Sequence, residues 1–157
     1  MKRTFIIFKA RGAEYGIDLQ KVVSIERNSK VTTLPQVPDY MVGIVSIRGK
    51  VIPVIDSNFL LFQKYLQGEE EPRYILLEVQ GSTIALMVES TNEILEIEDS
   101  LIKPVEMMNA NYWIEGVALK GDRIISIIDS GEMISTIRDI KHIQKELLFS
   151  EEIQSVI

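Results

Sequence analysis

The stretch that decides the fold runs from Pro38 to Asp56 and reads P-D-Y-M-V-G-I-V-S-I-R-G-K-V-I-P-V-I-D. Two apolar runs flank the turn Arg48-Gly49-Lys50. Short runs rich in β-branched residues on either side of a glycine-containing turn predict a hairpin of two buried strands. Gly49 can supply the positive φ that a tight turn requires. Pro53 has no amide hydrogen to donate, so it predicts an edge position or a bulge for the second strand.

A similar stretch occurs later in the chain, where Trp113 to Asp129 reads W-I-E-G-V-A-L-K-G-D-R-I-I-S-I-I-D. Gly43 precedes Asp56 by thirteen positions, and Gly116 precedes Asp129 by the same number. A weaker likeness is found before each hairpin, and its two copies are 69 residues apart. The two hairpins are 73 residues apart, so the later copy contains four extra loop residues. This pattern predicts a duplicated β unit. The alternative is a chance likeness between two apolar hairpins.

The remaining pattern predicts mainly β structure. Turn signals recur roughly every 8–12 residues, which is typical of sandwiches and barrels, and no helical pattern long enough for a parallel crossover occurs before residue 130. The acidic segment 67–72 is expected to be an exposed connector between a first unit at about 14–66 and a second at about 73–130. Apolar residues at helical spacing then predict an amphipathic helix over about 131–148, which we expect to pack on the core.

Composition narrows the function classes. The chain has 157 residues, a net charge of −6, no cysteine and one histidine. A length of 157 residues fits one domain or two intimate subdomains, and the acidic balance argues against nucleic-acid binding. The absence of cysteine excludes disulfides and Cys-based zinc sites and fits a reducing compartment. No apolar run is long enough to span a bilayer, so we expect a cytoplasmic protein without membrane insertion.

Nothing in the sequence points to catalysis. His142 falls on the polar side of the predicted terminal helix, and the acidic run 69–71 falls in the connector. Asp56 and Asp129 end their strands at matching places, which indicates helix capping. No glycine-rich phosphate loop is present. The sequence therefore predicts no catalytic residue, no metal site and no cofactor.

Several motifs together carry a resemblance. They are Tyr15-Gly16-Ile17-Asp18, the whole stretch from Pro38 to Asp56, Ile102-Lys103-Pro104, Gly121-Asp122-Arg123 and Ile128-Asp129. In this order the chain resembles the CheW family of chemotaxis coupling proteins, and the likeness extends from residue 4 to about residue 133.

The resemblance implies two five-stranded SH3-like β-barrel subdomains packed on a shared core, followed by a C-terminal helix. It also implies a non-catalytic adaptor that joins the cytoplasmic tips of chemoreceptors to the regulatory domain of the histidine kinase CheA. Such a protein is recruited from the cytoplasm to membrane receptor arrays. An adaptor for another receptor–kinase pathway, such as surface motility, is the nearest alternative, and a small-molecule-binding β-barrel is a more distant one.

The resemblance also implies candidate coupling residues. Val22, Gly43 and Arg48 match family positions implicated in receptor or kinase coupling, and Gly49 completes the Arg-Gly turn. Ser24 stands where the family usually has glutamate. If Arg48 is structural, its partner should be a carboxylate or buried carbonyls. If it serves a partner protein, its head should lie at the surface; we expect both roles, with function dominant.

Overall fold

The structure of the protein is a computed structural model that describes residues 1–27, 30–67, 71–79, 81–104 and 113–137. In the described residues the strands are β1 (Lys2–Ala10), β2 (Ala13–Asp18), β3 (Val22–Glu26), β4 (Met41–Ile47), β5 (Lys50–Asp56), β6 (Arg73–Val79), β7 (Ser82–Val88), β8 (Ser90–Glu98), β9 (Ile102–Lys103), β10 (Ile114–Lys120) and β11 (Arg123–Ile128). The helices are α1 (Ser57–Phe62) and α2 (Ser130–Thr136), with 3₁₀ turns η1 (Leu19–Lys21) and η2 (Asp99–Leu101).

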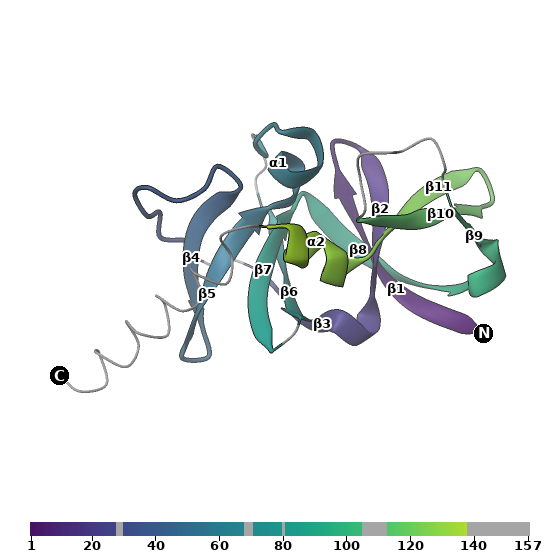
Figure 1. Ribbon diagram of the computed structural model, residues 1–157, viewed down its shortest axis with the longest axis horizontal. Helices are drawn as coiled ribbons and strands as arrows, with labels where there is room; N and C mark the ends of the chain where they lie inside the picture. The colour runs from purple at the N-terminus through teal and green to yellow at the C-terminus, as the bar shows by residue number, and fades with distance from the viewer. Residues whose placement is uncertain (28–29, 68–70, 80, 105–112, 138–157) are drawn as a thin grey trace.

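Two β-sheets lie side by side, with α1 at the top of Figure 1 and α2 in front of the region between them. The five-stranded sheet has the order β3-β6-β7-β5-β4, and the six-stranded sheet has the order β8-β1-β2-β11-β10-β9. The predicted mainly β fold with a helix after the last strand is confirmed. Two details differ from the prediction, because the sheets are open at an edge and the short strand β9 adds a sixth strand to the second.

The duplication is visible in the strand pairing. β5 runs parallel to β7 with Val54 opposite Ala85, and β11 runs parallel to β2 with Ile127 opposite Gly16. Val54 and Ile127 are 73 residues apart, and Gly16 and Ala85 are 69 apart, which are the two offsets read from the sequence. The structure therefore confirms the repeat in its register as well as in its order of elements.

The two repeats exchange their first hairpins, which the predicted division of the chain did not foresee. β1 and β2 belong to the six-stranded sheet, whose other strands all come from the second repeat, while β6 and β7 complete the five-stranded sheet of the first. The sheets thus cross the predicted boundaries of 14–66 and 73–130. The cause is the parallel pairing of β2 with β11 and of β7 with β5, which joins strands far apart in the chain.

The described residues form three apolar clusters. One lies inside the curl of the five-stranded sheet and contains Val54 and Leu76. Another lies inside the six-stranded sheet and contains Phe5 and Ile127. The third and largest draws residues from both sheets, for example Phe8 and Leu86, and is the shared core that was expected. Side chains on alternate faces of each strand thus enter different cores, as the two-residue period of a strand requires.

Each repeat ends in a short helix capped by an aspartate. Asp56 Oδ1 accepts hydrogen bonds from the amides of Asn58 and Phe59 at the start of α1. Asp129 Oδ1 accepts one from the amide of Glu132 at the start of α2. Both caps confirm the prediction and satisfy amides that a helix leaves unpaired at its N-terminus.

The predicted terminal helix is not continuous through Ile137. α2 ends at Thr136, because Ile137 adopts an extended backbone with φ −78° and ψ 105°. Met133, Ile134 and Ile137 are buried in the shared core, so this part of the apolar stripe packs as expected. The rest of the predicted helix, residues 138–148 with His142, lies outside the described residues.

The position of Pro53 corrects a second expectation. β5 is an interior strand of the sheet, and the register shift in its pairing with β4 falls between Met41 and Gly43, away from the proline. Pro53 is tolerated because the parallel pairing with β7 begins one residue later, at Val54. The hydrogen-bond ladder between β5 and β7 therefore does not require the amide hydrogen that Pro53 lacks.

Candidate coupling surface

Strand β3 carries Val22 and Ser24 at one edge of the five-stranded sheet, where its described neighbour is β6. A bulge between Val22 and Ser24 bends the strand. Val22 is half-buried against the shared core, while Val23 and Ile25 are exposed. The Ser24 hydroxyl is buried without a hydrogen-bond partner among the described residues. This edge therefore presents apolar side chains and backbone groups to a partner.

Arg48 and Gly49 form the β4–β5 turn at the other edge of the same sheet. Their φ angles are +52° and +80°, so both central residues of the turn are left-handed, as a tight hairpin turn of this kind requires. The Arg48 side chain is 71% exposed, and its Nη2 lies 3.6 Å from Glu26 Oε2 on β3. Because β3 and β4 are opposite edges of the sheet, this ion pair spans the opening of the curled sheet.

The Arg48–Glu26 pair bears on both roles considered for Arg48, because it gives the guanidinium a carboxylate partner and still leaves it at the surface. Exposed ion pairs typically contribute about 0–1 kcal/mol to folding stability. Arg48 is largely exposed while Glu26 is half-buried, so the pair is expected to contribute little to folding stability, and the guanidinium lies at the surface of the rim. The structure thus brings Arg48 and Gly49 toward the strand that carries Val22 and Ser24.

Gly43 differs from the other candidates because it is buried. It lies on β4 at the register shift, and an added Cβ would lie 2.8 Å from the carbonyl carbon of Thr32 and closer still to its oxygen. Thr32 and Ile44 form an isolated bridge beside it, through two hydrogen bonds of 2.8 Å. Gly116 repeats this arrangement, since its Cβ would lie 2.7 Å from the carbonyl oxygen of Lys103. The first role of Gly43 is therefore to let two backbone segments approach closely.

The sequence patterns did not indicate one pair of exposed apolar residues. Leu119 and Ile124 lie opposite each other on β10 and β11 and are 64% and 61% exposed. The equivalent positions of the first repeat are Ser46 and Val51. The apolar run that contains Ile124 is continuous in the sequence, as in a strand buried on both faces. In the structure, side chains alternate between the two faces of β11, so Ile124 is exposed and Ile125 is buried. The signal was therefore present in the strand period.

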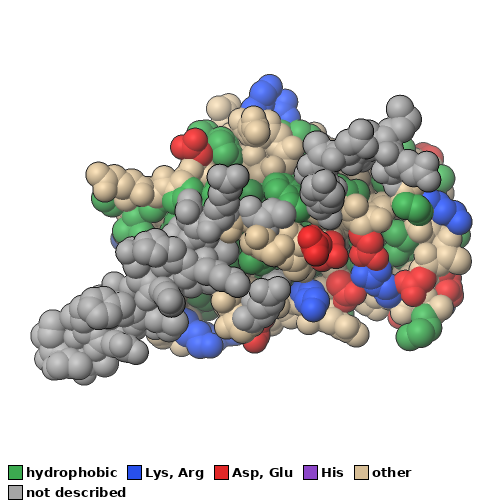
Figure 2. Space-filling model, in the orientation of Figure 1, with side chains coloured by type: hydrophobic (Ala, Val, Ile, Leu, Met, Phe, Trp, Pro, Cys, Tyr) green, Lys and Arg blue, Asp and Glu red, His purple; other side chains and the backbone are tan. Residues whose placement is uncertain are grey.

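Charged side chains gather on the six-stranded sheet, over the part of the surface in Figure 2 that lies near the N-terminus. Arg123 of β11 donates to both oxygens of Glu14 on β2, at 3.1 and 2.6 Å, and to both oxygens of Glu93 on β8, at 3.2 and 2.5 Å. Hydrogen bonding to Arg123 lowers the pKa of Glu14 and of Glu93. Carboxylates held ionised in this way are poorly suited to general acid catalysis.

A second arginine cluster lies near the start of β1. Arg3 donates to Asp18 Oδ2 at 3.2 Å and to Glu115 Oε1 at 2.5 Å, and its Nε lies 3.9 Å from Asp99. In the part of the chain that the structure describes, no group of three or more potential ligand side chains is arranged to hold a metal ion. Within those same residues, no helix is long and apolar enough to cross a membrane.

Comparisons with known proteins agree with this geometry. The family model described as "CheW-like domain" matches residues 4–138. The "Chemotaxis protein CheW" of Bacillus subtilis is 28% identical over 82% of this chain and 85% of its own length. The protein of the same name from Klebsiella aerogenes is 26% identical over 84% and 81%. The crystal structure of the scaffolding protein TtCheW from Thermoanaerobacter tengcongensis superposes with a TM-score of 0.78, at 27% identity, over 87% of this chain and 95% of that one.

Proposed function

The chain belongs to the CheW-like domain family, and on that premise we propose that it couples the cytoplasmic tips of chemoreceptors to the regulatory domain of the histidine kinase CheA. The observation that carries the proposal is the family match over nearly all of the described chain, together with the likeness in fold to a CheW scaffolding protein. A chemotaxis scaffold of this kind acts by holding two partners together. Its activity therefore lies in its surfaces.

The five-stranded sheet supplies the surface for one of these contacts in our proposal. Val22 and Ser24 lie on its open edge, and Arg48 reaches that edge through Glu26. Exposed Val23 and Ile25 add apolar area next to these groups. An apolar centre with a charged rim is the composition that protein interfaces usually have. We assign coupling to Val22, Ser24, Arg48 and Gly49, and to Gly43 through the position of β4.

The same proposal holds that the protein has no catalytic activity of its own. The carboxylates of the two arginine clusters form ion pairs with Arg3 and Arg123, and the sequence contains no phosphate loop. Purified protein incubated with ATP is expected to release no phosphate and to transfer none. Hydrolysis that persists through further purification would contradict this part of the proposal.

Calorimetric titration tests the coupling function. The full chain is titrated with the cytoplasmic fragment of a chemoreceptor and, separately, with the regulatory domain of CheA. We expect saturable binding to both, and simultaneous binding of both when they are mixed. Binding to the kinase domain without binding to the receptor fragment would point to another receptor–kinase pathway. Binding to neither would refute the proposal.

A matched pair of variants tests the assigned surface. Arg48→Asn removes the guanidinium but keeps a residue that accepts a positive φ. Arg11→Asn makes the same change at the β1–β2 turn, where Arg11 and Gly12 have φ +50° and +78°. Arg48→Asn should weaken receptor-fragment binding about tenfold, the loss expected for a charged contact at an interface, while Arg11→Asn should leave it unchanged. Equal effects of the two variants would remove Arg48 from the surface.

A further inference from the structure

A hollow on the five-stranded sheet is lined by two carboxylates that have no cationic partner among the described residues. It has a volume of about 360 Å³ and lies between the loop before β4, the segment after α1, and strands β4 and β7. Asp39 and Asp56 are its charged lining residues, and Met41, Met87 and Tyr65 are among the others. Small-molecule pockets typically range from roughly 300 to 1,000 Å³. This hollow is near the lower limit and has room for one large side chain.

The carboxylate of Asp56 gives the hollow its negative charge. Asp56 is only 2% exposed. Its Oδ1 accepts the amides of Asn58 and Phe59, and its Oδ2 accepts the amide of Leu66 at 2.9 Å. These amides, two of them at the N-terminus of α1, stabilise the ionised carboxylate, but none of them carries a full positive charge. Among the residues that the structure describes, no lysine, arginine or histidine lies within 4 Å of the carboxylate of Asp56 or Asp39.

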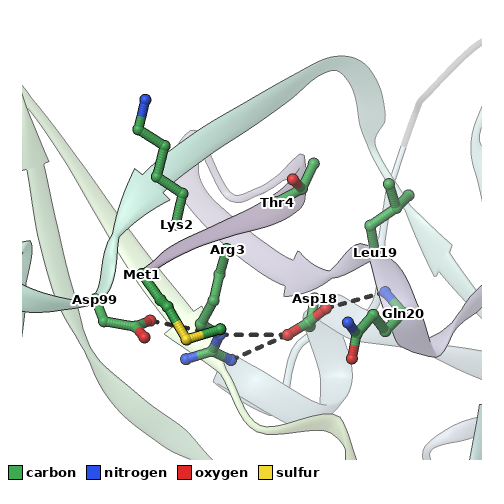
Figure 3. A pocket seen from close by; sticks show the side chains of 8 residues that line it. All are labelled: Met1, Lys2, Arg3, Thr4, Asp18, Leu19, Gln20 and Asp99. Atoms are coloured by element: carbon green, nitrogen blue, oxygen red, sulfur yellow. Dashed lines mark hydrogen bonds and ion pairs between the residues drawn. The ribbon is translucent and has the colours of Figure 1, made fainter.

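The hollow shown in Figure 3 lies at the other end of the molecule and behaves differently. There the guanidinium of Arg3 lies between the carboxylates of Asp18 and Asp99, at 3.2 and 3.9 Å. The carboxylates of that hollow form ion pairs within the chain, so they do not attract an external cation to a comparable degree. The hollow beside Asp56 lacks an arginine of this kind. A buried carboxylate without a counter-ion favours the approach of a cation.

The walls of the hollow suit a side chain that is both cationic and apolar. The ring of Tyr65 stacks on Phe59, with centroids 4.7 Å apart and planes at 25°, so the aromatic face at the rim is held in place. Aromatic faces attract cations, and a guanidinium can stack on them. Met41 and Met87 offer polarizable apolar contact for an aliphatic stem.

We propose that this hollow receives the arginine side chain of a partner protein. The stem lies against Met41 and Met87, and the guanidinium faces Asp39 and the Asp56 carboxylate beside Tyr65. Charge complementarity carries the choice of occupant, because the hollow is lined by two carboxylates and by no basic side chain. The chain can bind receptor and kinase through other surfaces whether or not this hollow is filled. The proposal therefore stands or falls independently of the coupling function.

Nuclear magnetic resonance of the ¹⁵N-labelled full chain tests the proposal with small probes. The first probe is N-acetyl-arginine amide, and the second is N-acetyl-citrulline amide, which has nearly the same shape but no charge. We expect saturable shifts confined to the amides of residues 37–42, 65–66 and 87 with arginine, and affinity at least about tenfold lower with citrulline, since charge-assisted contacts are the stronger ones. N-acetyl-lysine amide should bind more weakly than arginine.

Two exposed carboxylates provide the variant and its control. Asp39→Asn should weaken binding of the arginine probe by about threefold or more, and Asp122→Asn, at the distant β10–β11 turn, should leave it unchanged. Both positions are exposed, so both variants are expected to fold. Equal affinity for arginine and citrulline, shifts spread over the acidic surface, absence of saturation, or an unaffected Asp39→Asn would each overturn the proposal. Equal binding of lysine would overturn the choice of arginine.

Discussion

The two sheets hold their curl with different side-chain chemistry. In the six-stranded sheet, Arg123 connects β11 to both β2 and β8 through four hydrogen bonds of 2.5–3.2 Å. Arg3 makes a similar set of contacts near the other end. In the five-stranded sheet, the corresponding bridge is a single ion pair at 3.6 Å between the exposed Arg48 and the half-buried Glu26. Lys50 stands at the repeat position of Arg123, and Pro72 at that of Arg3.

This difference shows which features the repeat retains. Both copies keep a glycine at the backbone crossing, a register shift beside it, and an aspartate that caps the following helix. These features serve the backbone, whose geometry is common to both copies. The charged side chains are not shared, because each sheet faces different neighbours. The five-stranded sheet therefore keeps a lightly bridged edge, which is where we place the coupling surface.

The largest expected effects come from the two crossing glycines. Gly43→Ala and Gly116→Ala should each lower the free energy of unfolding by about 1–3 kcal/mol, because the new methyl group meets backbone atoms that cannot move away. Gly43→Ala should be the worse of the two, since its Cβ approaches the Thr32 carbonyl more closely. Urea unfolding of both variants measures this. Stability unchanged in either variant would show that the crossing is not tight there.

Removal of Arg123 should have the next largest effect. Arg123→Leu breaks two bidentate contacts and leaves Glu14 and Glu93 facing each other without the cation that bridges them, with only the weaker influence of Lys9 and Lys120. We expect the melting temperature to fall by about 5 °C, given the strength of bidentate charge-assisted bonds and the size of the domain. Thermal unfolding followed by circular dichroism gives the value. A fall no greater than that of Arg48→Asn would mean that the two sheets are bridged equally.

The charge cluster also predicts how stability depends on pH. Arg123 lowers the pKa of Glu14 and Glu93 below the ordinary value of 4.5. Because their pKa values are lower in the folded state, the cluster stabilises the fold fully above roughly pH 4.5, and this contribution disappears as the pH falls through the lowered values. Urea unfolding between neutral pH and roughly pH 3 should show a smaller acid-induced loss in Arg123→Leu than in the parent protein. Parallel loss in both proteins would contradict this origin.

The smallest effect on stability is expected for Arg48. Arg48→Asn should change the free energy of unfolding by less than about 1 kcal/mol, because the Arg48 side chain is largely exposed and the new residue accepts the turn geometry. Thermal unfolding and receptor-fragment binding are measured on the same sample. A near-parental melt with weakened binding supports the functional role. A collapsed melt, or unchanged binding to receptor and kinase, would exclude it.

Much of the local structure could be predicted because it depends on neighbouring residues. Patterns within short windows predicted the hairpin around Gly49 and the caps at Asp56 and Asp129. The 69- and 73-residue offsets were found by matching such short patterns between the two copies. The candidate surface was less accessible to prediction. Arg48 was identified through a family resemblance, but its pairing with Glu26 across the open edge depends on how far the sheet curls.

The amino-acid sequence by itself determined the hairpins, the helix caps, the existence of the repeat and the family of the chain. Only the tertiary structure decided that β2 joins β11 and that β7 joins β5, because parallel pairing joins strands that are far apart in sequence. It also decided that Arg3 and Arg123 bridge strands, while no described lysine, arginine or histidine lies beside the carboxylates of Asp39 and Asp56. Turn and capping preferences act within a few residues, whereas the partner of a charge or of a sheet edge is known only after the chain has folded.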